Sequence, residues 1–205
     1  QFWTVTGSDK HGLPRAGDDD VLIALLKLAS DQGFKDRRIN FTRYEVMQIL
    51  GWDPCGANYR RFEGSLERLA GVRIMAKNCF WDCLKKLYTS LYFGLIDDYQ
   101  ILDRGGRQLQ QLEMPLTHVN LNEKFFQSLR DGNLKRLDLS LYYRLRAAVS
   151  KRLYRFLDKR AHRKQFFEVD LYSMATVNLG LDLSTRKYAS QVKQMLEPAH
   201  EELHE

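Results

Sequence analysis

One order of predicted elements, namely helix, short strand, helix, turn and helix, occurs twice along the 205 residues and limits the folds open to the chain. In the first half, three aspartates at 18–20 place negative charge ahead of an apolar face, which predicts the start of a helix. This helix is expected to end at Gly33, and Ile39 and Phe41 then mark a short β-prone segment.

The next residues complete the first copy of this order. Thr42 and Glu45 have the spacing of a capping box, which predicts a second helix over residues 43–50. Residues 51–54 contain glycine and proline, so a turn is expected before a third helix over residues 57–70. Polar side chains recur at spacings of three and four on this third helix and are expected to project together into solvent: Asn58, Arg61, Ser65 and Arg68.

Strand-like segments follow the third predicted helix. Residues 72–76 and 92–102 are β-rich, and a further strand is expected around residues 109–119. Helices in a helix-turn-helix arrangement, followed by a β-hairpin, have the order of a winged-helix domain. We therefore predict one winged-helix domain over residues 1–115.

The remaining residues, 116–205, repeat this plan with different side chains. A long amphipathic helix is expected over residues 140–162, followed by a short strand over residues 165–169. Asp170 is then expected to cap a helix that Gly180 ends. This second copy predicts a second winged-helix domain.

A last helix is expected to begin at a cap formed by Asp182 or Ser184. Its apolar inner face consists of Val192, Leu196, Ala199 and Leu203. A wing hairpin should follow this helix, but the sequence ends at Glu205, so the second domain is expected to lack a complete wing. The predicted fold class is α+β, with two tandem winged-helix domains.

The outer face of the last helix suits base readout. In a helix-turn-helix module the second helix enters the major groove, with its N-terminal residues at the base edges. Arginine can form two hydrogen bonds with a guanine edge, and glutamine can do the same with adenine. The candidate base-reading residues are Arg186, Lys187, Ser190, Gln191 and Gln194, and Lys193 is a candidate phosphate contact.

Positive charge is concentrated in the second half of the chain. The formal net charge is +6, and residues 135–193 hold 14 lysines and arginines against 5 acidic residues. Within residues 144–164, nine basic residues face one acid, Asp158, whereas a merely solvated helix usually mixes both signs. Phosphate contacts are therefore assigned to Arg155, Lys159, Arg160, Arg163 and Lys164, and more weakly to Asn58, Arg61, Ser65 and Arg68 in the first half.

Several segments, taken in their order along the chain, resemble one known family. They are Trp3–Ser8, Gly12–Pro14 with Asp18–Ala24, Val72–Trp81, Phe93–Asp97 and Arg152–Leu157. Over nearly its whole length the sequence resembles the replication initiator protein A group of plasmid initiators, which are related in architecture to iteron-binding Rep proteins.

This resemblance implies tandem winged helices and a function without catalysis. It implies that the C-terminal domain reads directly repeated origin sequences, while the N-terminal domain serves dimerisation and DNA backbone contacts. It further implies that monomers bind and melt origin DNA and recruit the host initiator and helicase, whereas dimers repress or couple origins.

One motif near the end of the sequence suggests a different function. His200, Glu201 and His204 match H-E-x-x-H, a zinc hydrolase motif, but only one residue remains for a third ligand and Leu203 belongs to the core face. A phosphate-binding P-loop and a pair of histidines around one apolar residue are both missing from the sequence. We therefore expect no enzymatic activity, cofactor or metal, and keep a zinc hydrolase as a remote alternative.

Two non-enzymatic alternatives stay open. A winged-helix transcriptional repressor or partition adaptor would read DNA through the same helices, and a scaffold could use the basic helix to bind acidic proteins. Cys55, Cys79 and Cys83 suggest no disulfide framework, and no apolar stretch approaches the ~18 residues of a membrane span. The N-terminus also lacks the order of a signal peptide, so a soluble protein of the bacterial cytoplasm is expected.

Overall fold

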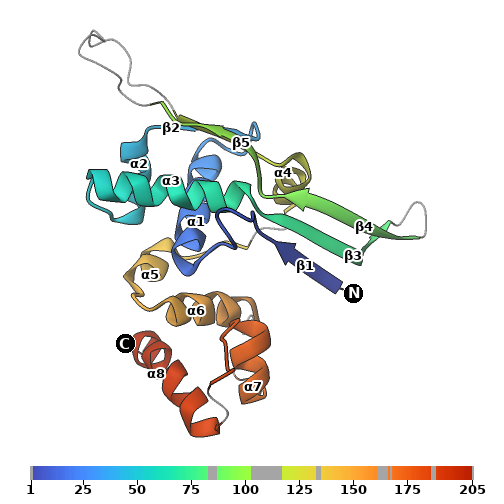
Figure 1. Cartoon of the computed structure of the whole chain (residues 1–205), viewed down its shortest axis with the longest axis vertical. Coiled ribbons are helices and arrows are strands. Elements are labelled where there is room, and N and C mark those ends of the chain that lie inside the picture. Colours follow the sequence, from blue (N-terminus) through green and yellow to red (C-terminus); the bar gives the residue numbers. More distant parts are fainter. Residues whose placement is uncertain are drawn as a thin grey trace. The chain divides into compact units, whose positions relative to one another are not determined.

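The computed structural model divides the chain into two compact units, Gln1–Leu134 and Lys135–Glu205 (Figure 1). The structure describes residues 2–82, 87–102, 117–132, 135–160, 166, 168–185 and 188–204. The sequence predicts a domain boundary after residue 115. In the structure, residues 117–121 form a strand that pairs with two strands of the first unit, and this unit extends to Leu134.

The first unit combines helices with two three-stranded sheets. Its helices are α1 (Ala16–Asp31), α2 (Arg43–Leu50), α3 (Gly56–Ala70) and α4 (Glu123–Arg130). Its strands are β1 (Phe2–Thr6), β2 (Arg38–Phe41), β3 (Arg73–Asp82), β4 (Leu87–Gly94), β5 (Ile96–Gln100) and β6 (Thr117–Leu121). This mixture confirms the predicted α+β class.

Both sheets are antiparallel, and each joins strands that are distant from one another in the sequence. One has the order β1-β3-β4, in which Thr4 pairs with Met75 and Ile74 pairs with Phe93. The other has the order β2-β6-β5. The first β-rich segment after the third helix, β3, therefore pairs with the N-terminal strand β1. The β-rich segment over residues 92–102 is divided between β4, which pairs with β3, and β5, which pairs with β6. Strand β2 also pairs with β6.

The core of the first unit lies between its helices and the β2-β6-β5 sheet. Leu25 from α1 and Phe62 from α3 are fully buried, as are Ile39 of β2 and Ile96 of β5. The rings of Phe41 and Phe62 meet edge to face, with centroids 6.1 Å apart. Burial of such large apolar side chains is the main stabilising contribution to a unit of this size.

Helix α2 begins and ends where the sequence predicts. The Glu45 N–H donates to the Thr42 hydroxyl at 3.2 Å, and the Thr42 N–H donates to the Glu45 carboxylate at 2.6 Å. The predicted capping box is thus confirmed. Gly51 ends the helix with a φ of 65°, a left-handed conformation that glycine adopts without steric cost.

The second unit is helical in its described residues. Its elements are α5 (Leu139–Arg144), α6 (Ala148–Arg160), α7 (Leu171–Ser173), the π-helical turn η1 (Met174–Asn178) and α8 (Ala189–His204). Its core cluster is formed by Leu153, Met174, Leu179, Leu196 and Ala199, with Leu203 packed against it. These contacts confirm the predicted inner face of the last helix. None of the helices in the described part of the chain is long and apolar enough to span a membrane.

The prediction of one long helix over residues 140–162 is wrong. Helix α5 ends at Arg144, and α6 begins at Ala148 after an extended residue at Leu145. The backbone N–H groups of Arg146 and Ala147 donate to the Glu202 carboxylate of α8 at 2.8 and 3.1 Å. Because these bonds satisfy N–H groups outside the helix, α6 starts as a separate helix.

Other expectations for the second unit have mixed outcomes. The Ser173 N–H donates to Asp170 at 2.8 Å, which confirms Asp170 as a helix cap. The predicted strand over residues 165–169 is not found at the described positions 166, 168 and 169. Asp182 accepts the Ser184 N–H at 2.8 Å within a turn, so neither residue caps α8, which begins only at Ala189.

Candidate nucleic-acid interface

The outer face of α8 carries the described residues that the sequence assigns to base readout. The apolar face of this helix packs on the core, and Ser190 and Gln194 are exposed on the other side. Gln191 is half-buried, and its side-chain oxygen accepts the Tyr188 N–H at 3.4 Å. Gln191 thus holds the first turn of α8, whereas Ser190 and Gln194 present polar groups to solvent.

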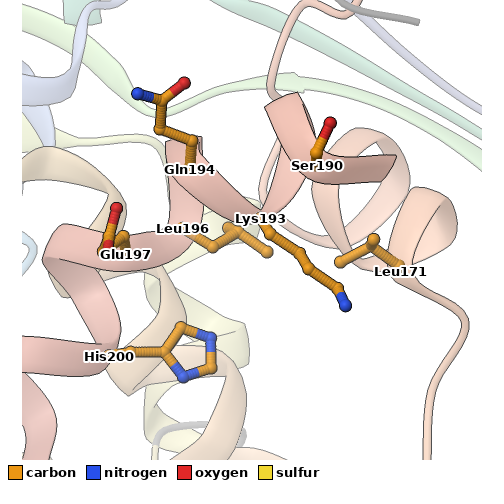
Figure 2. Close-up of a pocket in the computed structure, with 7 residues that line it drawn as sticks. All are labelled: Leu171, Ser190, Lys193, Gln194, Leu196, Glu197 and His200. Atoms are coloured by element: carbon orange, nitrogen blue, oxygen red, sulfur yellow. The ribbon is translucent and has the colours of Figure 1, made fainter. Parts of the chain in front are cut away.

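An open hollow of about 610 Å³ lies beside this face, where α8 meets α7 (Figure 2). It is lined by Leu171, Ser190, Lys193, Gln194, Leu196, Glu197 and His200. Figure 2 shows Lys193 extending toward Leu171 of α7, whereas Gln194 points away from it. The two side chains therefore leave the helix in different directions, so Lys193 and Gln194 can contact different groups of one ligand.

Helix α6 presents a basic outer face. Lys151, Arg155 and Lys159 recur at intervals of four residues, so they lie on one side of the helix. The one acid of the helix, Asp158, pairs with Lys135 at 2.8 Å. Since this pair neutralises Asp158, the outer face of α6 keeps its positive character.

Two other arginines of α6 differ in their surroundings. Arg152 donates to the Leu179 carbonyl at 2.7 Å and so satisfies the C-terminal end of η1. The Arg160 guanidinium is exposed and lies 6.0 Å from the centroid of the Phe156 ring. Arg152 therefore supports the fold of the second unit, while Arg160 stays on the surface at the end of the helix.

Four predicted DNA-binding residues lie outside the described residues: Arg163, Lys164, Arg186 and Lys187. Their roles in phosphate binding and base readout stay predictions.

The expectation that Asn58, Arg61, Ser65 and Arg68 project together into solvent is wrong for two of them. Ser65 is 1% exposed, and its hydroxyl donates to the Arg61 carbonyl at 3.0 Å. The Arg68 guanidinium donates to both carboxylate oxygens of Asp18, at 2.7 and 2.8 Å. The cause is the packing of α1 along this side of α3, which covers the C-terminal half of the predicted stripe.

The other two residues of the stripe lie near the turn before α3. The Asn58 side chain donates to the Asp53 carbonyl at 2.9 Å and ties the turn to the helix. The Arg61 guanidinium lies 4.0 Å above the ring of Trp52 and is exposed. Arg61 thus stays available as a phosphate contact in a fixed position.

The contact between Asp18 and Arg68 joins α1 to α3. Burial acts to raise the pKa of Asp18, but hydrogen bonds from Arg68, from the Arg15 N–H and from Ser65 outweigh it and lower the pKa below its ordinary value. The hydrogen bonds that Arg68 donates to Asp18 raise the pKa of Arg68, although burial acts to lower it. Both groups therefore remain charged at neutral pH, and the pair fixes the two helices against each other.

The H-E-x-x-H segment lies in the last turns of α8. His200, Glu201 and His204 are exposed, and Glu202 holds the start of α6. Among the described residues, no group of three histidines, cysteines or acids is placed to hold a metal ion. Within this segment, Glu202 therefore has a structural role, because it accepts the backbone N–H groups at the start of α6.

Replacing Glu202 with alanine is expected to lower the free energy of unfolding of the second unit by about 1–2 kcal/mol, the range for losing a charged helix cap. The variant removes the acceptor for the Arg146 and Ala147 N–H groups. Urea unfolding followed by circular dichroism measures the loss. The matched control is Glu201→Ala, an exposed neighbour on the same helix, and an equal loss in both variants would contradict the capping role.

The sequence did not identify two residues whose positions become clear in the structure, Glu202 and Arg60. Glu202 could not be found from a local pattern, because the N–H groups that it binds lie 55 and 56 residues earlier. Arg60 is exposed on α3 beside the predicted stripe. Placing the buried face of α3 around Phe62 and Leu69 would have identified Arg60 as the residue that points outward.

Comparisons with known proteins were made at the levels of sequence and fold. The sequence profile of the family described as replication initiator protein A matches residues 3–202. No curated protein matches the chain. A crystal structure of domain 2 and domain 3 of RctB, as selenomethionine derivatives, is similar with a TM-score of 0.64 at 10% identity, covering 98% of this chain and 78% of that one. A second crystal structure of RctB domains 2-3 has a TM-score of 0.58 at 11% identity, covering 96% and 76%. At these identities the likeness shows a shared fold.

Proposed function

The chain belongs to the replication initiator protein A family, and on this premise we propose that it initiates plasmid replication by binding repeated double-stranded origin sequences, or iterons. In this proposal it acts by binding DNA and by recruiting the host initiator and helicase, without catalysing a reaction.

One observation carries the assignment of DNA binding to the second unit. The polar outer face of α8 and the basic outer face of α6 belong to two helices that pack on each other. The Ser150 hydroxyl of α6 donates to the Pro198 carbonyl at 3.5 Å, and Glu202 of α8 caps the start of α6. Residues suited to phosphates and residues suited to bases are thus held in one rigid unit, as sequence-specific binding requires.

We further propose that each unit is a winged-helix domain. In the first unit, α2, the turn after it and α3 have the order of a helix-turn-helix, and in the second unit α7, η1 and α8 have the same order. The sheet order β2-β6-β5 supports a wing in the first unit, because the strand before α2 pairs with the second strand of the β5-β6 pair.

A homodimer in equilibrium with a monomer is part of this proposal. The β1-β3-β4 sheet supports it, because Trp3 and Val5 are 57% and 50% exposed on one face. Val5 pairs with Ile74, and Ile74 pairs with Phe93, so these apolar side chains lie on the same face of the sheet. Sedimentation equilibrium over a range of protein concentrations measures this association.

A footprint of the intact protein on its neighbouring plasmid DNA tests the proposal. Protection of several repeats in the same orientation, next to an AT-rich tract, is the expected result. Protection of one inverted repeat over a promoter would instead identify a transcriptional repressor, and protection of a partition site would identify a partition adaptor. Stoichiometric zinc in the purified protein would revive the hydrolase alternative.

Duplex binding is expected to weaken steeply with salt. Arg155, Lys159, Arg160 and Lys193 are the described cations assigned to phosphates in the second unit. If all four contact phosphates, the log-log plot of affinity against salt has a slope of about −3.6 or steeper. Fluorescence anisotropy at increasing potassium chloride measures the slope. Weak binding that does not change with salt would favour a scaffold for acidic proteins.

A further inference from the structure

We infer that α3 of the first unit also reads base edges in the major groove, with Arg60 as its specificity-determining residue and a guanine as the base it contacts. The inference rests on the proposed function, because its ligand is duplex DNA. It gives the first unit a part in sequence readout, beyond the backbone contacts expected from the sequence.

Arg60 lies at the centre of the outward face of α3. Phe62 and Leu69 mark the buried side of this helix. At 3.6 residues per turn, Arg60 falls on the opposite side, and it is exposed. Three of its four neighbours one turn before and after are small, namely Gly56, Ala57 and Gly64, and the fourth is Glu63. Because Gly56 has no side chain, the Arg60 guanidinium lies against it, with Nη1 3.5 Å from where a Cβ of Gly56 would be. From this exposed position the flexible Arg60 side chain can extend toward a DNA groove.

The charge around Arg60 fits a nucleic acid. Glu63, one turn away, pairs with Arg43 at 2.9 Å. Glu67 lies 3.2 Å from the His11 ring and about 10 Å along the helix axis from Arg60, at a rise of ~1.5 Å per residue. The N-terminal half of α3 therefore presents positive charge, and its acidic residues are either paired or distant.

The turn before α3 fixes the start of this helix. Asn58 holds the Asp53 carbonyl, and Arg61 packs over Trp52. In a helix-turn-helix, the N-terminal residues of the second helix contact the base edges, and Arg60 is in the second turn of α3. Arginine on guanine is the commonest specific contact in the major groove, because its guanidinium donates to both guanine acceptors. Arg60 thus lies in the second turn of a helix whose start is held by the contacts of Asn58 and Arg61.

Selection from a random duplex library by the intact protein tests the inference. The same selection is made with Arg60→Ala, Arg60→Lys and the control Arg130→Ala, which removes an exposed arginine from the end of α4. The expected motif of the unaltered protein contains a G·C pair that Arg60→Ala no longer selects. The unaltered protein should bind the selected duplex more tightly than a duplex with an A·T pair at that position. The Arg60→Ala variant should lower this ratio of affinities by about 5- to 100-fold.

The remaining outcomes separate this inference from the proposed function. If Arg60→Ala keeps every position of the motif, or weakens all duplexes alike, Arg60 does not read bases and the proposed function stands. If the unaltered protein selects no duplex, both are overturned. Because Arg60 is exposed, Arg60→Ala should unfold at the same temperature as the unaltered protein, and the control should retain the full motif.

Discussion

The Asp18→Ala variant is expected to lose about 3–5 kcal/mol of the free energy of unfolding of the first unit, the range for breaking a buried ion pair. Asp18 is 1% exposed and accepts two hydrogen bonds from Arg68 and one from the Arg15 N–H, at 2.6 Å. Its removal leaves a largely buried guanidinium without a counter-charge. Urea unfolding monitored by tryptophan fluorescence measures the loss, and a value below about 1 kcal/mol would contradict the role assigned to the pair.

The same variant has a defined pH dependence. The pKa of Asp18 in the folded protein lies below the ordinary value of 3.8, so the folded state favours the charged carboxylate. Its contribution to stability is therefore complete above pH 3.8 and is lost as the pH falls through the folded pKa. The difference between the unaltered protein and Asp18→Ala should be largest at pH 7 and should shrink below pH 4. A difference that stays constant to pH 2 would show that the lost stability is not electrostatic.

Asp19→Ala provides the matched control for these measurements. It removes a half-buried carboxylate from the same turn of α1 and leaves the pair of Asp18 with Arg68 in place. Its cost is expected to stay below about 1 kcal/mol, which is the usual range for an acidic residue near a helix N-terminus.

The parts of the fold that could be predicted from sequence are those specified by neighbouring residues. Thr42 and Glu45 form a capping box through their own backbone, so the start of α2 follows from four residues. The apolar face of α8 was likewise predicted from its period, and the structure buries Val192, Leu196 and Ala199. Such features need no knowledge of distant parts of the chain.

The features that could not be predicted depend on contacts between distant segments. The break between α5 and α6 is invisible locally, because residues 140–160 have a helical pattern and the acceptor that interrupts it is Glu202. The burial of Ser65 and Arg68 depends on where α1 packs, and Asp18 lies 50 residues from Arg68 in the sequence. An amphipathic pattern gives the direction of the buried face but not its width, so residues at its edge were misassigned.

The candidate site shows the same division. The assignment of α8 to base readout uses only its polar stripe, and the structure places Ser190 and Gln194 on the exposed side. Among the basic residues of α6, however, a count of charges cannot distinguish Arg152, which binds the Leu179 carbonyl, from Lys159 on the surface. Charge density predicts α6 as a phosphate-binding helix, and tertiary contacts indicate which of its basic side chains are engaged within the second unit.

Gln194→Ala and Lys159→Ala are expected to affect DNA binding in different ways. Gln194 is exposed at the second turn of α8 and can form two hydrogen bonds with an adenine edge. Its removal should lower discrimination at one A·T pair by about 5- to 100-fold, while affinity for unrelated duplexes stays the same. Lys159 is exposed on α6, and its removal should weaken all duplexes alike and make the salt slope less steep by about 0.9.

The contrast between these two variants tests whether base readout and phosphate binding are carried by different helices. Fluorescence anisotropy with the footprinted repeat, a single-pair mutant of it and an unrelated duplex measures both quantities at several salt concentrations. Gln127→Ala and Lys124→Ala repeat the same chemical changes at exposed positions on α4, and both should bind like the unaltered protein. Equal losses on all three duplexes from Gln194→Ala would show that α8 contacts only the DNA backbone. Base readout would then have to come from another element, and the Arg60 variants on α3 would become the decisive measurement.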